Sequence, residues 1–192
     1  MRDRSEIRVA GFGGQGVILA GHLTGKAAAI YDGLEACVSQ AYGPEARGGA
    51  CHADVVISGG EILYPVVTSP DILMIMSQEA FDRYGRGERK SGAVVILEED
   101  LVTAEGDFYR VPATRIAEDL GTRLGANTAM LGAMVAITGA LSRQAVESSI
   151  RNTVKPRFVE YNLKVFDRGF EFGRSLINRR EQPAERHRGE VK

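Results

Sequence analysis

The chain has 192 residues, of which 44% are hydrophobic and 26% charged, and its formal net charge is −1. This length and composition are typical of one globular domain and exclude a disordered chain. A net charge near zero gives no field over the whole chain that would attract nucleic acid or an anionic membrane. We therefore expect neither among the partners, and any bound anion must be held by local groups.

The ends and the cysteines exclude further classes of protein. The first residues are rich in charge and lead into an apolar strand, without the apolar core of a secretory signal. The most apolar later stretch, residues 126–141, is short for a bilayer span. Cys37 and Cys51 lack metal-binding spacing, and two thiols are too few for a four-cysteine iron–sulfur cluster. We expect a cytoplasmic protein with reduced thiols and no metal ligands of its own.

The first part of the chain predicts a strand, a turn, a helix and a second strand. Residues 7–11 read as a buried strand and residues 11–16 as a tight glycine turn. Residues 17–30 carry apolar positions near 3.6-residue spacing, which predicts a helix, and residues 34–39 predict the next strand. This Rossmann-like βαβ opening favours a mostly parallel sheet.

The middle of the chain adds short strands, and the rest is mainly helical. Strand 51–58 leads through a glycine pair to a short strand at 61–64, and the two could form a hairpin. The other expected strands are 72–76, 93–97 and 108–111. The other expected helices are 78–84, 113–124, 128–137, 143–154 and 157–177.

These elements predict an α/β fold of three layers, in which a mostly parallel sheet carries helices on both faces. The C-terminal third should be helical. We expect one domain over residues 1–178. Residues 179–192 are polar and charged with one proline, which is typical of a disordered tail.

Gly11, Gly13 and Gly16 match the G-x-G-x-x-G pattern of dinucleotide-binding proteins, between a strand and a helix as that pattern requires. Glycines there let backbone amides approach a pyrophosphate at a helix N-terminus. The pattern also needs an acidic residue at the end of the second strand, where this sequence has Val38-Ser39-Gln40. The fingerprint is incomplete, so a turn that serves only helix–sheet packing is the alternative to a cofactor site.

The same turn contains Gly14 and Gln15. Gln15 is its one polar side chain, which could bind a ligand, a neighbouring group or water. The sequence leaves these three roles open.

A second candidate segment lies between the strands 34–39 and 51–58. Pro44 stiffens its entry, and the paired glycines near its end leave room for a ligand or another backbone. Arg47 is a planar donor suited to a carboxylate or phosphate, although Glu45 could pair with it in an ordinary surface loop. The candidate residues of this loop are Tyr42, Gly43, Pro44, Glu45, Arg47, Gly48 and Gly49.

The rest of the sequence shows no catalytic residues of its own. Cys51 and His52 are adjacent in a strand, so their side chains point to opposite faces and cannot form a nucleophile–base pair. No serine lies in a G-x-S-x-G turn. These observations point to a partner that performs the chemistry. Residues 127–134, which combine small residues with two methionines, would suit either the core or a partner interface.

Together, the turn Gly11-x-Gly13-Gly14-Gln15-Gly16 and the later run Gln-Ala-Tyr-Gly-Pro-Glu-Ala-Arg-Gly-Gly-Ala at residues 40–50 resemble the gamma subunit of 2-oxoacid:ferredoxin oxidoreductases. Residues 54–58 and 70–73 support this resemblance, which extends from about residue 7 to 177. The loop at 42–49 is most similar to that of 2-oxoglutarate enzymes. A pyruvate or branched-chain 2-oxoacid enzyme, or a stand-alone NAD(P)- or CoA-binding Rossmann-like protein, are the alternatives.

The resemblance implies a heteromeric enzyme that converts a 2-oxoacid to an acyl-CoA and passes electrons to ferredoxin. Its implied partners are alpha and beta (thiamine-binding) subunits and a ferredoxin-like delta subunit. Thiamine diphosphate, magnesium, iron–sulfur clusters and CoA would be held mainly by those partners. This chain would carry no catalytic or metal-binding residue, and its two motifs would lie near the active site.

Overall fold

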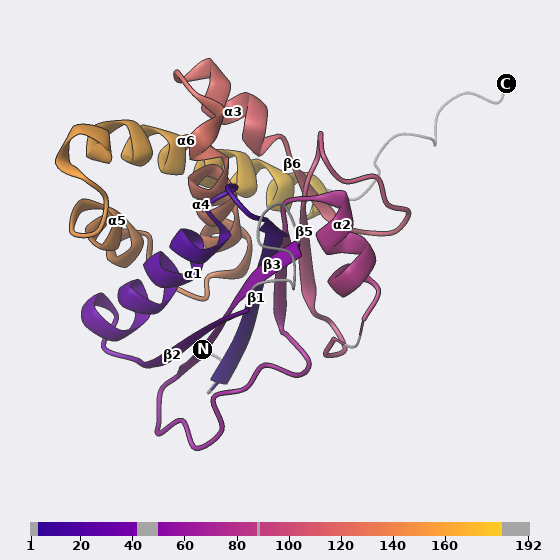
Figure 1. The fold of residues 1–192 in the computed structure, drawn as a ribbon, viewed down its shortest axis with the longest axis vertical. Helices are drawn as coiled ribbons and strands as arrows, with labels where there is room; N and C mark the ends of the chain where they lie inside the picture. Colours follow the sequence, from indigo (N-terminus) through magenta and orange to yellow (C-terminus); the bar gives the residue numbers. More distant parts are fainter. Residues whose placement is uncertain (1–3, 42–49, 88, 182–192) are drawn as a thin grey trace, which may run out of the picture.

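Figure 1 shows the computed structural model of the chain, which describes residues 4–41, 50–87 and 89–181. The strands in these residues are β1 (Arg4–Phe12), β2 (Glu35–Ala41), β3 (Ala50–Ser58), β4 (Ile72–Ile75), β5 (Val94–Glu98) and β6 (Tyr109–Val111). The α-helices are α1 (Val17–Lys26), α2 (Gln78–Ala80), α3 (Ala113–Asp119), α4 (Ala126–Thr138), α5 (Arg143–Arg151) and α6 (Pro156–Glu181). Short helical turns at Ala27–Tyr31, Phe81–Gly85 and Arg123–Gly125 complete the helical segments.

The strands form one sheet in the order β2-β3-β1-β4-β5-β6. The strands β1, β4, β5 and β6 run parallel to one another, whereas β3 is antiparallel to both β1 and β2. The expected mostly parallel α/β sheet is therefore confirmed. However, β3 lies between β1 and β2, so the two strands of the Rossmann-like opening are parallel without being neighbours.

The expected short strand at residues 61–64 is wrong, and so is its hairpin with β3. Both edges of β3 are already used, because Ser58 pairs with Arg4 of β1 on one side and with Glu35 of β2 on the other. A strand has only two hydrogen-bonding edges, so none remains for a third partner. Residues 61–67 instead form an irregular loop at the end of the sheet where β1 begins.

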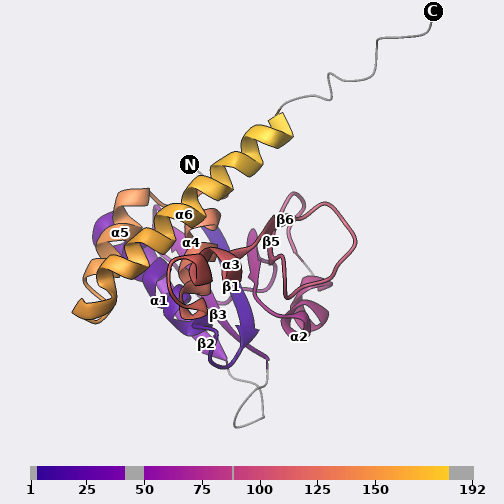
Figure 2. The ribbon, with the colours of Figure 1, turned by 90° about the horizontal axis from the view of Figure 1, so that it is seen from above.

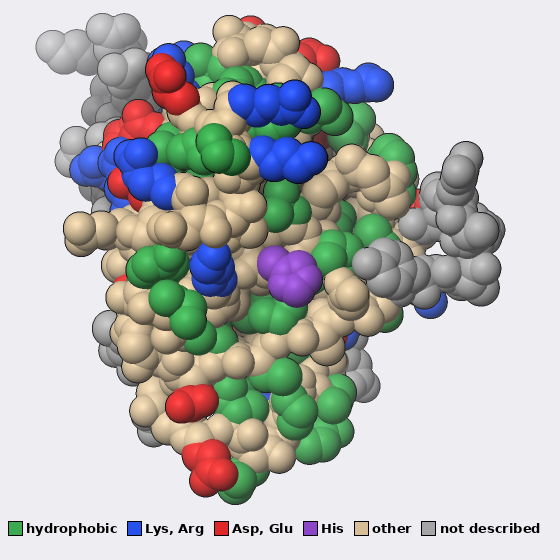
Figure 3. Space-filling model, turned by 60° about the vertical axis from the view of Figure 1, so that its left-hand side comes forward, with side chains coloured by type: hydrophobic (Ala, Val, Ile, Leu, Met, Phe, Trp, Pro, Cys, Tyr) green, Lys and Arg blue, Asp and Glu red, His purple; other side chains and the backbone are tan. Residues whose placement is uncertain are grey.

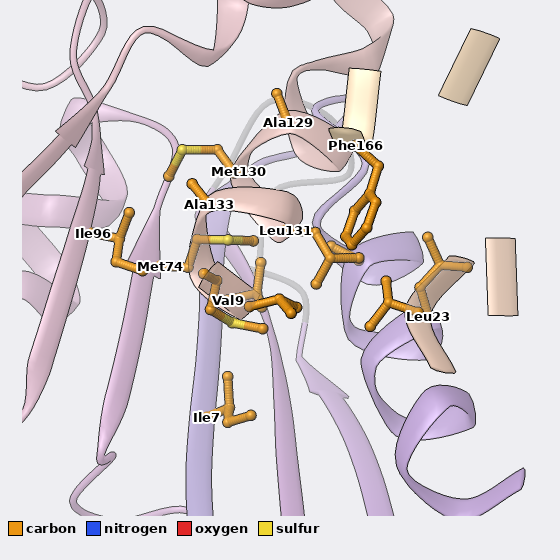
Figure 4. Close-up of a cluster of buried hydrophobic side chains, with 14 of the residues drawn as sticks. Ile7, Val9, Leu23, Met74, Ile96, Ala129, Met130, Leu131, Ala133 and Phe166 are labelled. Atoms are coloured by element: carbon orange, nitrogen blue, oxygen red, sulfur yellow. The ribbon is translucent and has the colours of Figure 1, made fainter. Parts of the chain in front are cut away.

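Helices cover both faces of the sheet, which confirms the three layers. The larger core lies between the sheet and the helices α1, α3, α4, α5 and α6, and Figure 4 shows part of it. Its fully buried large side chains include Ile7, Leu23, Met74, Ile96, Met130, Leu131, Met134 and Phe166. The smaller core lies under α2 and joins Phe81 to Leu73, Ile75 and Leu97.

Helix α4 is the centre of the larger core, since every residue from Ala126 to Val135 is buried. The 26-residue helix α6 crosses over it (Figure 2). At the crossing, Gly132 of α4 and Gly169 of α6 each lie directly against the other helix's backbone. The methionines at 130 and 134 are therefore core residues of this chain, which settles the choice left open by the sequence.

Helix α6 continues to Glu181, past the start of the expected polar tail at residue 179, and the remainder of that tail lies outside the described residues. In the part of the chain that the structure describes, no helix combines the length and apolarity needed to cross a bilayer.

Candidate functional site

The glycine turn and the residues that flank the second motif lie at one edge of the sheet, where the parallel strands end. The glycine turn follows β1 at this edge, and the loop at residues 42–49 joins the end of β2 to the start of β3. Phe12 pairs directly with Ala50, and Ala41 pairs with His52. The loop itself lies outside the described residues. Ligands of open α/β sheets bind at this carboxyl edge, so it is the candidate site.

The glycine turn is a tight connection that ends in the first turn of α1. Gly14 and Gly16 have φ angles of 102° and 77°, in the left-handed region that favours glycine. Gly16 is the N-cap residue of α1, and the Gln15 amide donates a hydrogen bond to the carbonyl of Phe12 at 3.2 Å. The backbone conformation therefore explains the glycines at 14 and 16 without a ligand.

The side chain of Gln15 is used inside the protein. Its Oε1 accepts a hydrogen bond from the Phe12 amide at 2.9 Å, and its Nε2 donates one to the Met76 carbonyl at 2.7 Å. Gln15 thus ties the glycine turn after β1 to the segment after β4. Of the three roles that the sequence left open, the structure supports contact with a neighbouring group.

The glycine turn also fits tightly against the rest of the domain. A Cβ atom on Gly11 would lie 2.5 Å from Gln15 Oε1 and 2.8 Å from Val17 Cγ2. A Cβ atom on Gly16 would lie 2.5 Å from Asn127 Nδ2, which itself donates to the Gly16 carbonyl at 3.1 Å. Asn127 is 2% exposed and comes from α4, more than a hundred residues away, so no pattern in the sequence predicts this contact.

The geometry does not fit a dinucleotide cofactor. Because β3 separates β1 from β2, the end of β2 lies two strand spacings, roughly 10 Å, from β1. The Rossmann pattern places an acidic residue there, beside the glycine turn, to bind the ribose. This strand instead ends at Ser39-Gln40-Ala41. The incomplete fingerprint is thus accompanied by a different strand order.

The described residues do not fit a metal centre either. They contain no group of three or more His, Cys, Asp or Glu side chains placed to hold a metal ion. Cys51 is buried in the larger core, and burial raises the pKa of its thiol. Cys37 pairs in register with Val56, five residues along β3, so the two cysteines point to opposite faces of the sheet.

A polar cluster that sequence analysis missed lies on the α2 side of the sheet. Arg8 of β1 and Asp54 of β3 form a bidentate ion pair, with both N–O distances 2.7 Å. His52 Nδ1 lies 3.1 Å from the Tyr84 hydroxyl, and the two rings meet edge to face. Register pairing places Arg8 opposite Asp54, but their separation in sequence hid this contact.

Burial is the main reason that the pKa of His52 lies below its usual value, and Arg8 and Arg83 lower it further while Asp54 opposes them. A lowered pKa means that the unfolded chain binds a proton more readily than the folded chain does. We therefore expect the free energy of unfolding to fall as the pH drops below about 6.5. Urea denaturation between pH 7.5 and 5.5 measures this, and His52→Gln should flatten the dependence.

The matched control is His22→Gln, which changes an exposed histidine on α1. This variant should keep the pH dependence of the wild type. An unchanged slope in His52→Gln would mean that other groups cause the acid sensitivity.

Comparison with known proteins defines the class of protein. The model of the family "pyruvate ferredoxin/flavodoxin oxidoreductase" matches residues 6–172, and the chain belongs to this family. It is 45% identical over 183 residues to the 2-oxoglutarate synthase subunit KorC of Methanocaldococcus jannaschii, covering 92% of this chain and 97% of that protein. Identity to KorC of Methanothermobacter thermautotrophicus is 48% over 178 residues, covering 88% and 94%.

A solved structure agrees with these relatives. The gamma subunit of a keto/oxoacid ferredoxin oxidoreductase from Geobacter sulfurreducens superposes with a TM-score of 0.80 at 43% identity, covering 90% of this chain and 97% of that one. The resemblance inferred from the two motifs is therefore confirmed at the level of the family and the fold.

Proposed function

We propose that this chain is the gamma-type subunit of a 2-oxoglutarate:ferredoxin oxidoreductase, an enzyme that forms an acyl-CoA from a 2-oxoacid and CoA and reduces ferredoxin. The observation that carries this proposal is identity of 45–48% to KorC subunits along nearly their whole length. Pyruvate and branched-chain 2-oxoacids are the alternative substrates. A stand-alone NAD(P)-binding role is less well supported, because the strand order moves β2 away from the glycine turn.

The proposed role of the chain is to form part of the wall around a site whose cofactors are held by partners. When bound, thiamine diphosphate supplies the carbanion chemistry of such enzymes. We assign to alpha, beta and ferredoxin-like delta subunits the binding of magnesium, thiamine diphosphate and iron–sulfur clusters, and most contacts to CoA. The residues of this chain that we place near the site are Gly11, Gly13, Gly14, Gln15, Gly16, Tyr42, Gly43, Pro44, Glu45, Arg47, Gly48 and Gly49.

In this proposal the two motifs have different roles. The backbone of the glycine turn is held by Gln15 and Asn127, which make it a rigid rim of the site. Ala50, the first described residue after the loop at 42–49, pairs with Phe12 beside this rim, and Glu79 of α2 accepts a hydrogen bond from its amide at 3.1 Å. A rigid rim next to a glycine-rich loop is suited to closing one side of a partner's active site.

The proposal predicts that the purified chain folds but has no oxidoreductase activity alone. Reduction of a viologen dye should require 2-oxoglutarate, CoA and the partner subunits together. The same assay with pyruvate, a branched-chain 2-oxoacid and NAD⁺ as acceptor separates the alternatives. Turnover by the single chain, with either acceptor, would contradict the proposal.

A second prediction concerns Arg47, whose guanidinium suits a CoA phosphate, a substrate carboxylate or a carboxylate of a partner. Arg47→Ala should leave the stability of the isolated chain unchanged, because a loop arginine contributes little to the stability of a domain. In the assembled enzyme the change should cost about 2–5 kcal/mol of binding, and Arg47→Lys should restore only part of it. Steady-state kinetics with CoA and 2-oxoacid varied separately, beside a pull-down of partners, identifies the anion. Unchanged kinetics and unchanged assembly would show that Arg47 takes part in neither substrate binding nor partner contact.

A further inference from the structure

The loop at residues 61–67 exposes an unusual run of apolar side chains. Leu63, Tyr64 and Val66 are 83%, 60% and 46% exposed, and Pro65 between them is exposed as well. Isolated exposed apolar residues are common. Several in succession expose apolar surface to water at a cost in free energy, and such runs mark functional surfaces. We call residues 62–66 the apolar loop.

The apolar loop is held in place by the sheet. Arg4 Nη2 donates a hydrogen bond to the Tyr64 carbonyl at 2.7 Å, and Arg8 Nη2 donates one to the Val67 carbonyl at 3.0 Å. The side chain of Val67 is only 4% exposed, so the end of the loop is buried. A fixed loop loses little conformational freedom on binding, which is how preorganised recognition surfaces gain affinity.

The surroundings of the apolar loop are acidic. Glu61 directly precedes the apolar loop, and Glu35 begins β2 opposite Ser58. Both glutamates are exposed. Among the described residues, the cations at this edge are Arg4 and Lys90, and both are already paired with carboxylates of the same chain. On the face drawn in Figure 3, acidic and apolar side chains occupy the lower end, while Lys and Arg gather towards the upper end.

We infer that the apolar loop is a docking element for another subunit of the enzyme, one that offers an apolar hollow rimmed by Lys and Arg. This inference rests on the proposed function for the identity of the partner. Charge decides among the possible occupants. A second copy related by two-fold symmetry would bring Glu35 and Glu61 close to like charges, and an anionic membrane would repel them. A basic partner surface complements them.

This surface is separate from the candidate site. The apolar loop lies at the edge where β1 begins, whereas the glycine turn lies where β1 ends. The chain would therefore contact its partners at both edges of the sheet, with the docking contact at one and the site contact at the other.

The test uses the complex reconstituted from wild-type partner subunits. Leu63→Asp and Tyr64→Asp should each weaken assembly about 30-fold or more, since buried interface anchors are worth at least that much. Leu63→Met keeps the apolar contact and should stay within about 3-fold of the wild type. Phe158→Asp introduces the same charge at an exposed aromatic residue of α6, outside both proposed contact surfaces, and should also stay within that range. Glu61→Lys should slow association most at low salt.

Melting of each isolated variant checks that the fold is kept. Assembly of Leu63→Asp with wild-type affinity overturns the inference, as does equal loss in Phe158→Asp. Size-exclusion chromatography of the isolated chain tests for binding of a second copy. Sedimentation with anionic vesicles tests for binding to a membrane. A dimer or vesicle binding that Leu63→Asp abolishes would also overturn it. If the wild-type chain does not assemble at all, the proposed function fails with it.

Discussion

Gly169→Val is expected to prevent the chain from reaching its native fold, or to lower its stability by more than about 3 kcal/mol. A Cβ atom at this position would lie 2.1 Å from the Ala129 carbonyl oxygen and 2.7 Å from the carbonyl carbon. Both are backbone atoms of α4, which cannot turn aside as a side chain can. Gly132 of α4 has the reciprocal contact, with a Cβ position 2.2 Å from the Phe166 carbonyl oxygen.

Relief of this contact would have to move α6 away from α4. Helix α4 lies between the sheet and α6, so separation would open the larger core around Met130 and Phe166, both fully buried. Loss of such packing is among the costliest changes that a single substitution makes. The effect should therefore exceed that of Gly173→Ala, where the nearest backbone atom, the Ala133 oxygen, is 2.8 Å from the Cβ position.

The measurement is urea denaturation of the isolated chain, followed by circular dichroism. Arg168→Val is the matched control, because it places the same β-branched side chain at an exposed neighbouring position of α6. Its free energy of unfolding should fall by only about 0.5–1 kcal/mol, because valine has a lower helix propensity than arginine. Equal stability of Gly169→Val and Arg168→Val would show that the two helices can separate freely.

The sequence predicted the type of nearly every element, because hydrophobic periodicity and glycine turns are local signals. It could not predict that β3 enters between β1 and β2, since strand order depends on pairing between distant segments. The wrong strand at 61–64 has the same cause. A hairpin with β3 requires a free edge of β3, and both edges are paired with distant strands.

The glycines of α6 show a second limit of reasoning from sequence. In the sequence, Gly169 and Gly173 weaken the apolar stripe of α6, because glycine is a poor helix former. In the structure they are the reason that α6 can touch α4. Propensity describes a residue in isolation, whereas close helix packing depends on what lies opposite.

At the candidate site, the sequence identified the candidate residues but not the hydrogen-bond partners that fix their positions. Both motifs were recognised from residue types, yet the partners of Gln15 and Gly16 come from residues 76 and 127. The cluster of Arg8, Asp54 and Tyr84 likewise joins three separate segments. Contacts of this kind leave no pattern along a single sequence.

The ion pair between Arg8 and Asp54 is expected to have the second-largest effect on stability. Arg8→Ala should cost about 3–5 kcal/mol, because it leaves a carboxylate of low exposure without its cation. The side chains of Arg8 and Asp54 are 17% and 8% exposed. The hydrogen bond to Asp54 is also the main reason that the pKa of Arg8 is raised.

A double substitution separates the ion pair from the position of the apolar loop. Arg8→Met with Asp54→Leu removes both charges and should recover most of the stability lost in Arg8→Ala, as apolar replacements of buried pairs do. It cannot restore the hydrogen bond from Arg8 to the Val67 carbonyl at the end of the apolar loop. We therefore expect the double variant to be nearly as stable as the wild type in urea, yet to assemble more weakly with the partner subunits. Wild-type assembly by a stable double variant would show that Arg8 serves the fold alone, and that Arg4 is enough to hold the loop.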